Sequence, residues 1–152
     1  MRFQIENVDW MSGKNRLTEL REQVFVVEWR IPRQAEFDDR DPDALHILVS
    51  DENHQPVATG RITRDGEIGR IAVLHAYRTL DVYKILFRSL IKLGKTARVD
   101  QVKVVCNLAS VDEHKARGYT PEGPVFMEAG IPRQRMFCPI NRFRLPDVQE
   151  CH

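Results

Sequence analysis

Cysteine and histidine are the residues of this 152-residue chain that most readily support covalent or metal chemistry. Cys106, Cys138 and Cys151 form no C-x-x-C pair and have no histidine at a metal-ligand spacing. We therefore expect no metal site and no disulfide framework. Cys106 lies in the apolar run 102–106, which predicts a small buried side chain. A Cys106 nucleophile with His114 as its base is the open alternative, since a thiolate is a competent nucleophile.

Charged side chains gather in two stretches that could bind ions or ligands. Residues 36–43 are dominated by acids: Glu36, Asp38, Asp39, Asp41 and Asp43. Their polarity predicts a solvated loop. The C-terminal end is locally basic, with Arg133, Arg135, Arg142 and Arg144. Solvated surface is the first interpretation of these arginines, and a patch for an anionic ligand or partner is the second.

The composition favours one folded domain over residues 1–140, followed by a polar tail or linker over residues 141–152. The 23 Lys and Arg against 22 Asp and Glu give a net charge of +1, and 42% of residues are apolar. These values exclude a disordered chain and a globally basic nucleic-acid binder. The longest apolar runs are far too short to cross a membrane, and residues 1–6 offer no apolar stretch of the kind expected in a signal peptide. We expect a cytoplasmic protein, with a frayed tail or a further domain after it.

Hydrophobic periodicity predicts the elements that must position these residues. Helices are expected over residues 12–29, with Ser12 as N-cap, and 82–97, with Asp81 as N-cap, and a short one over 111–117. Strands are expected over residues 3–8, 44–50, 57–63, 67–74, 101–106, 125–129 and 135–139. The early strands form an antiparallel meander, and the helix over 82–97 connects parallel strands by a right-handed crossover. The fold class is α+β, with a mixed, mainly antiparallel sheet and helices on both faces.

Four segments share the order and spacing of one known family. They are residues 21–28 (REQVFVVE), 44–48 (ALHIL), 69–73 (GRIAV) followed by Tyr77 and Arg78, and 118–119 (GY) with 128–132 (EAGIP). Together they resemble the GNAT superfamily of acetyl-CoA-dependent N-acetyltransferases, specifically its ElaA-like branch. The resemblance spans residues 2–140 and implies the GNAT fold with a splayed fourth strand.

The resemblance implies that an amine attacks the thioester carbonyl of acetyl-CoA directly and that CoA leaves as its thiolate. Such a site needs donors for the developing oxyanion, a base, an acid and a cradle for the pyrophosphate. In the family, the backbone of the splayed strand contacts the pantetheine and thioester, which maps onto Ile71, Ala72 and Val73. The cradle is the loop into the next helix, where free amides and the helix dipole favour phosphate.

The cradle departs from the family pattern. The family motif is R/Q-x-x-G-x-G/A, whereas this chain has Arg78, Thr79, Leu80, Asp81, Val82 and Tyr83. Arg78 is kept, but Asp81 and Tyr83 replace glycines that let a bare backbone approach phosphate. The Asp81 carboxylate and a phosphate about 5 Å from it would repel each other by roughly 3 kcal/mol at an effective dielectric near 20. The loop therefore either binds CoA through Arg78 or folds without a phosphate site.

The resemblance also suggests catalytic and substrate residues. His114 lies where the family often has its general acid, a tyrosine, and an exposed helical histidine is the alternative. Asn107, at the end of the fifth strand, is implied to contact the cofactor. Glu28 is the candidate base. Arg61, Arg70 and Glu128 are the candidate substrate residues, and ion pairing is the alternative role for all of them.

The leading hypothesis is thus a GNAT-type N-acetyltransferase that moves an acetyl group from acetyl-CoA to a small-molecule or peptide amine. The alternative is a non-catalytic GNAT-like binding or regulatory module that has lost normal CoA binding. No nucleic-acid, membrane or metal partner is expected. A homodimer stays open as a further expectation.

Overall fold

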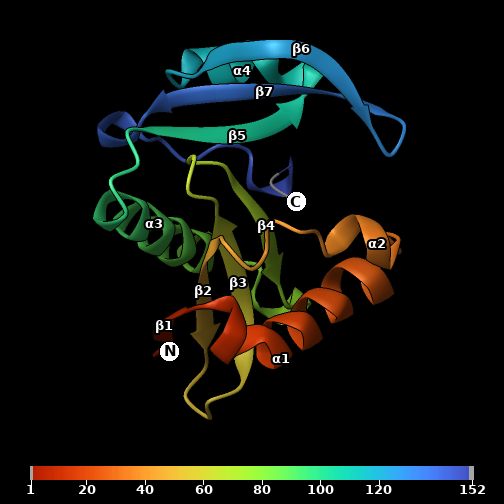
Figure 1. The fold of residues 1–152 in the computed structure, drawn as a ribbon, viewed down its shortest axis with the longest axis vertical. Helices are drawn as coiled ribbons and strands as arrows, with labels where there is room; N and C mark the ends of the chain where they lie inside the picture. Colours follow the sequence, from red (N-terminus) through yellow and green to blue (C-terminus); the bar gives the residue numbers. More distant parts are fainter. Residues whose placement is uncertain (1, 151–152) are drawn as a thin grey trace.

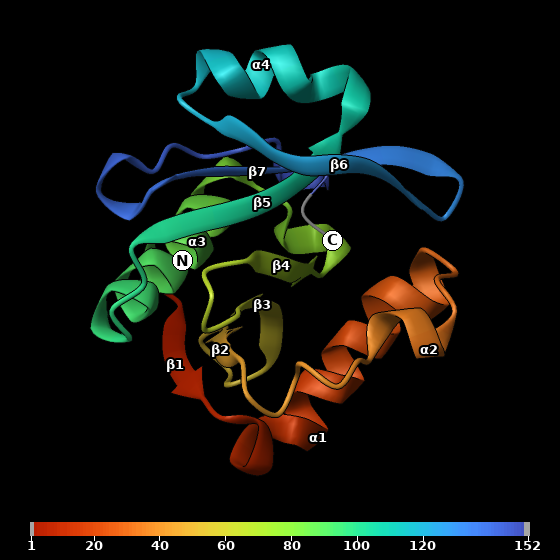
Figure 2. The same ribbon diagram turned by 45° about the horizontal axis from the view of Figure 1, so that its top comes forward.

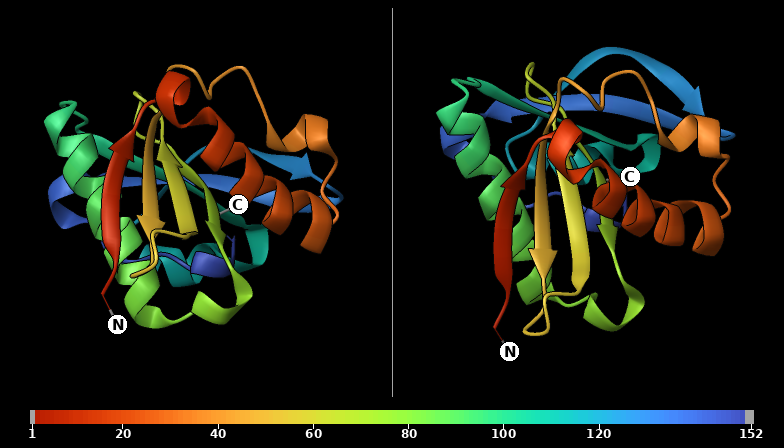
Figure 3. Two further views of the ribbon diagram at one scale, coloured as in Figure 1. Left: turned by 90° about the horizontal axis from the view of Figure 1, so that it is seen from below. Right: turned by 60° about the horizontal axis from the view of Figure 1, so that its bottom comes forward.

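Two β-sheets form the framework in the computed structural model, which describes residues 2–150. The first sheet has the order β1-β2-β3-β4, and its antiparallel strands are Gln4–Val8, Leu45–Ser50, Pro56–Ile62 and Ile68–Val73 (Figure 3). The second has the order β5-β7-β6, also antiparallel, with β5 Gln101–Asn107, β6 Thr120–Glu128 and β7 Ile131–Pro139. The α+β class expected from the sequence is confirmed.

Helices cover both faces of the first sheet. Their bounds are α1 Trp10–Arg21, α2 Arg33–Glu36, α3 Leu80–Thr96 and α4 Val111–Ala116. α1 and α3 both contact β2 and β3, and Figure 2 shows them on opposite sides of these strands. α4 lies on the outer side of the second sheet (Figure 1). None of the helices within residues 2–150 is both long and apolar enough to span a membrane.

The two sheets meet at a single point of strand pairing. Among residues 2–150, one bridge outside the named strands joins Glu67 to Lys103 in parallel, and the Lys103 amide donates to the Gly66 carbonyl at 2.8 Å. This confirms the parallel orientation expected on the two sides of α3. Beyond the bridge, β4 and β5 diverge (Figure 1), and an opening lies between the sheets where residues of both strands line one cavity.

Both expected N-caps are displaced by a few residues. The carboxylate of Asp9, not Ser12, caps α1 by accepting from the Ser12 amide at 2.8 Å. Thr79, not Asp81, caps α3, and its hydroxyl accepts from the Val82 amide at 3.3 Å. Each true cap has an extended backbone three residues before the amide that it binds, as an N-cap requires.

The helix expected over residues 12–29 changes type in its second half. After Arg21 the backbone widens into a π-helical segment, Glu22–Glu28. Val24 and Phe25 are buried in this segment, while Val27 is exposed. A π-helical turn is rare and is often found at functional sites. The altered phase brings Glu28 to the loop that follows β4.

The segment expected as a polar tail packs against the domain as far as it is described. Phe143, Leu145 and Val148 pack against the main core, and Pro146 is buried. Phe143 stacks on Phe87 of α3 with ring centroids 6.0 Å apart. The apolar side chains are too widely spaced to give a periodic pattern, which is why the sequence predicts a frayed end or linker here.

Candidate active site

A β-bulge in β4 creates the candidate site. Thr59 of β3 pairs with Ala72 and Arg61 with Gly69, so one residue of β3 lies opposite two residues of β4. Arg70, inside the bulge, has φ of +53°. A non-glycine residue in this left-handed region costs about 1–3 kcal/mol, and such strain clusters at functional sites. Bulges bend a strand and increase its twist. β4 therefore turns away from β5 at this position.

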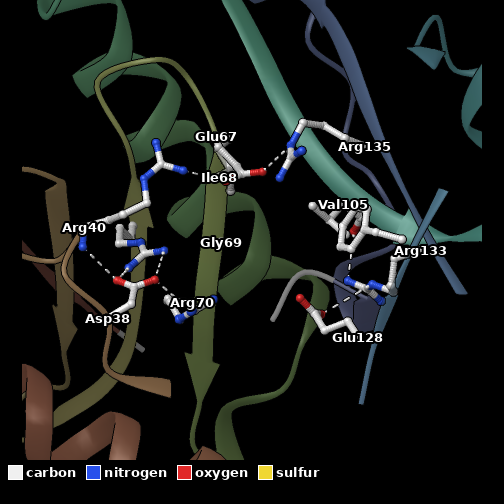
Figure 4. A pocket seen from close by; sticks show the side chains of 12 residues that line it. Asp38, Arg40, Glu67, Ile68, Gly69, Arg70, Val105, Glu128, Arg133 and Arg135 are labelled. Atoms are coloured by element: carbon white, nitrogen blue, oxygen red, sulfur yellow. Dashed lines mark hydrogen bonds and ion pairs between the residues drawn. The ribbon is translucent and has the colours of Figure 1, made fainter. Parts of the chain in front are cut away.

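The divergence leaves a polar cavity of about 150 Å³ between the sheets. Its walls come from β3, β4, β5, β6, β7 and the loop before β2: Asp38, Arg40, Arg61, Glu67, Ile68, Gly69, Arg70, Val105, Phe126, Glu128, Arg133 and Arg135. Figure 4 shows Asp38 and Arg70 on one wall and Glu128 and Arg133 on the other. Five arginines and three carboxylates line the cavity, so its walls carry charges of both signs. It contains all three expected substrate residues, Arg61, Arg70 and Glu128.

A buried ion network holds one wall of the cavity, and it overturns the expectation of a solvated loop over residues 36–43. Glu36 and Asp41 are fully buried, and Arg21 is 1% exposed. Arg21 donates to Glu36 at 2.7 Å and to Asp41 at 2.8 Å. These carboxylates are buried because cations from α1 and the sheet reach into the loop. Buried charges are tolerated only with such pairing.

Asp38 connects this network to the cavity. Arg61 donates to it at 2.7 Å and also to Asp41 at 2.9 Å, and Arg70 donates to Asp38 at 3.1 Å. Burial alone would raise the pKa of Asp38, but the hydrogen bonds and charges of the two arginines outweigh it and lower this pKa. Asp38 is therefore ionised and held between two cations. The ion-pair role that the sequence left open for Arg61 and Arg70 is realised.

Among the cavity carboxylates, Glu128 is the least engaged. Glu67 binds Arg40 at 3.0 Å and Arg135 at 2.8 Å. Glu128 pairs only loosely with Arg133, whose Nε lies 3.6 Å from its carboxylate, and half of the Glu128 side chain is exposed. A carboxylate with little direct hydrogen bonding retains acceptor capacity for an ammonium group.

Glu28 and Arg78 form a bidentate pair at the loop after β4. Arg78 donates through Nη1 to Glu28 Oε1 at 2.7 Å and through Nη2 to Oε2 at 2.5 Å, while its Nε donates to the Val73 carbonyl at 3.0 Å. The hydrogen bond from Arg78 holds the pKa of Glu28 below its usual value. Neither residue is among those that line the cavity. The candidate base is thus bound to the arginine that is expected to meet the pyrophosphate.

The rest of the cradle folds into the start of α3. Asp81 is exposed in the first helical turn, so it does not occupy the amides that Thr79 caps. Leu80 is also exposed, Val82 is buried and Tyr83 is half-buried. Burial raises the pKa of Tyr83. The carboxylate that binds Arg78 is therefore Glu28 and not Asp81.

His114 is not brought into the cavity. It lies in α4 and is 1% exposed, which corrects the alternative of an exposed helical histidine. Its Nδ1 lies 2.8 Å from the Ser110 carbonyl, and its Nε2 accepts from the Asp147 amide at 3.2 Å. Since an accepting Nε2 carries no proton, the neutral ring is protonated on Nδ1.

The end of β5 binds the C-terminal segment. The Asn107 amide and the Ser110 hydroxyl both donate to the Glu150 carboxylate, the second at 2.8 Å. Arg133 donates to the Glu150 carbonyl at 2.8 Å and to the Asn107 side chain at 2.6 Å. Sequence reasoning singled out Asn107 but missed Glu150, because an isolated glutamate in a polar stretch carries no sign of its partners.

Cys106 and Cys138 are free and buried. Burial, with a smaller contribution from the Glu150 charge, raises the pKa of the Cys106 thiol to about 11. Its Sγ contacts the Met136 sulfur at 3.4 Å, and no contact between Cys106 and His114 is recorded among the described residues. The buried structural role expected for Cys106 is confirmed. Within residues 2–150, no group of three or more His, Cys, Asp or Glu is arranged to hold a metal ion.

The candidate site therefore consists of a bulged β4 that diverges from β5 over a polar cavity. The model of the acetyltransferase (GNAT) family matches residues 14–119. An uncharacterized N-acetyltransferase of Bacillus subtilis, YjcF, is 31% identical over 77% of this chain and 86% of its own. The chain therefore belongs to the GNAT family of acetyltransferases.

Solved structures show the same fold. ElaA of Escherichia coli is 26% identical, with a TM-score of 0.66 over 91% of this chain and 99% of that one. An acyl-CoA N-acyltransferase from Pseudomonas aeruginosa has a TM-score of 0.72 at 21% identity, over 90% and 98% of the two chains. The second similarity supports the fold alone.

Proposed function

We propose that the chain transfers an acetyl group from acetyl-CoA to a primary amine by direct attack of the amine on the thioester. The observation that carries this proposal is the bulge at Arg70, beside which β4 diverges from β5 and a polar cavity lies between them. The site then offers a backbone edge to the thioester and a charged chamber to the acceptor.

The cofactor would lie along the opening between the two sheets. The backbone at Ile71, Ala72 and Val73 would bind the pantetheine arm and the thioester. Hydrogen bonds from preorganised backbone amides to a developing oxyanion are a large source of rate acceleration. At one end of the opening, Asn107 would contact the pantetheine. At the other, residues 78–83 would meet the pyrophosphate, with Arg78 as the cation.

The cavity would hold the amine. Glu128 is the carboxylate best able to bind an ammonium group, because Asp38 and Glu67 are each occupied by two arginines. Arg61 and Arg70 would set the electrostatic potential at the acceptor through Asp38. An amine must lose a proton to attack, and a carboxylate beside it favours the ammonium form until that proton leaves.

The roles of Glu28 and His114 as base and acid remain predictions. Glu28 can accept a proton only when Arg78 releases it, and a phosphate bound to Arg78 would do this. His114 could donate a proton from Nε2 only if the Asp147 amide leaves this nitrogen and the nitrogen then takes up a proton. Thiolates are good leaving groups near neutral pH compared with alkoxides, so the reaction needs less help from an acid than an ester would.

Calorimetric titration with acetyl-CoA and with free CoA tests the proposal. We expect saturable binding with a dissociation constant in the micromolar range, followed by release of free thiol when amines are added. Desulfo-CoA is the matched ligand control, since it retains the phosphates and pantetheine but cannot form a thioester. Absence of binding at millimolar acetyl-CoA would favour the alternative, a non-catalytic module, for which the Arg78–Glu28 pair is the supporting observation.

A further inference from the structure

As far as Glu150, the C-terminal segment runs into the space between β4 and the second sheet. Figures 1 and 2 place the end of the described chain between β4 and the second sheet. The segment reaches this position along a defined path, because Tyr119 donates to the Arg144 carbonyl at 2.7 Å and the Asp147 amide donates to His114. The segment is therefore docked at several points before it reaches Glu150.

Three groups from separate elements converge on Glu150. They are the Asn107 amide at the end of β5, the Ser110 hydroxyl just before α4, and the guanidinium of Arg133 on β7. The backbone N–H and the hydroxyl donate to the two carboxylate oxygens, and Arg133 donates to the main-chain carbonyl of Glu150 at 2.8 Å. Two donors directed at a carboxylate, with a cation beside them, form a site for a carboxylate. Arg133 is itself 7% exposed, so its charge acts in a poorly solvated place.

We propose that Asn107, Ser110 and Arg133 form a carboxylate-binding site on the path of acyl-CoA, and that Glu150 occupies it in cis as an autoinhibitory strap. The inference rests on the proposed function, which places the pantetheine of acyl-CoA at the same end of β5. The strap consists of residues 147–150. Acyl-CoA and the strap cannot both occupy the Asn107 amide, so binding of one displaces the other.

The strength of the strap follows from its tether. A group on a short flexible segment presents itself at an effective concentration of the order of millimolar. The apparent affinity for acyl-CoA falls by the fraction of molecules whose strap is open. A strap that is closed in about nine molecules of ten weakens acyl-CoA binding about tenfold.

Removal of the strap tests the proposal. We compare the acetyl-CoA dissociation constants of the wild type, Glu150→Ala and a chain that ends at Pro146, by calorimetry. Both variants should bind acetyl-CoA about tenfold more tightly than the wild type. Glu113→Gln is the matched control, because it removes one exposed carboxylate from α4 without touching the strap, and its dissociation constant should change less than twofold.

Hydrogen exchange provides a second measurement that does not depend on activity. The Asn107 amide should exchange faster in Glu150→Ala than in the wild type, and addition of acetyl-CoA should protect it in the variant. Equal affinity in all chains, or weaker binding in the shortened one, would overturn the strap while leaving the proposed function in place. Absence of binding in every chain, the shortened one included, would overturn the proposed function and the strap together.

Discussion

Carboxylates bind arginines both in the network around Asp41 and at the loop after β4, but in different environments. Asp41 and Glu36 are fully buried and Arg21 is 1% exposed. Glu28, by contrast, has 38% of its side chain exposed when it binds Arg78. A buried pair is expensive to break because each partner is left uncompensated, whereas an exposed pair exchanges its partner at little cost. The difference separates the fixed wall of the site from the contacts that a ligand can replace.

The largest expected effect is on the fixed wall. Arg21→Met removes the cation shared by Glu36 and Asp41, so we expect the free energy of unfolding to fall by about 3–5 kcal/mol. Urea unfolding followed by circular dichroism measures this loss. Arg16→Met is the matched control, because Arg16 forms an exposed pair with Glu6, and its cost should stay below about 1 kcal/mol. Similar losses in the two variants would contradict the distinction between the two regions.

The exchangeable pair should affect binding and not stability. Glu28→Gln frees Arg78, and we expect acetyl-CoA to bind about tenfold more tightly, which is about 1.4 kcal/mol. Asp81→Asn removes a carboxylate from the same loop that does not bind Arg78, and its gain should be smaller. Calorimetric titration of both variants measures the two gains. A larger gain from Asp81→Asn would mean that Asp81, and not Glu28, is the main obstacle to acetyl-CoA binding.

The buried region should also lose stability in mild acid. Burial lowers the pKa of His46 from its usual 6.5, with a further lowering by Arg21, although the Asp41 carbonyl opposes this. The unfolded histidine takes up its proton near pH 6.5, before the folded one does. The stabilising contribution is therefore complete above about pH 6.5 and is lost as the pH falls below it, by up to about 1.4 kcal/mol per pH unit.

Urea unfolding midpoints at pH 7.5 and pH 5.5 measure this loss. The decline between the two values should be smaller in His46→Gln, because glutamine takes up no proton. An equal decline in the variant and the wild type would assign the acid sensitivity to other groups.

The smallest expected effect links the strap to Cys106. Its pKa of about 11 predicts negligible reaction with iodoacetamide at pH 8 in the native state. Burial is the main cause, and the Glu150 charge is secondary, so Glu150→Gln should raise the alkylation rate by only a few-fold. Mass spectrometry of the peptide that contains Cys106 measures this rate. A rate unaltered by the variant would mean that Glu150 exerts no field on the thiol.

The sequence predicts the elements well where the pattern is local. The apolar positions Val82, Leu86 and Leu90 of α3 are buried as their spacing indicates. Cap identity is less predictable, since Ser12 and Asp81 each compete with a neighbouring residue of equal capping ability, and only the backbone conformation at Asp9 and Thr79 decides.

Long-range pairing accounts for the parts of the site that the sequence does not predict. Asp41 and Arg21 are 20 residues apart and Asn107 and Glu150 are 43 apart, and neither pair has a spacing that marks it. A carboxylate in a polar stretch has the same local pattern whether it meets solvent or an arginine from another strand. The resemblance identified Arg61, Arg70 and Glu128 as cleft residues, but it did not indicate their partners.

Within residues 2–150, a single bridge, between Glu67 and Lys103, joins the two sheets, so the facing edges of β4 and β5 form a seam that is closed at one point. Along most of β4 and β5, the lateral hydrogen bonds that would close one continuous sheet are not made between the two strands. A ligand with its own amide groups, lying in that seam, would act as an additional strand and connect the two half-sheets. Binding would then be a form of sheet completion, and the melting of the two halves would become more cooperative when the seam is filled.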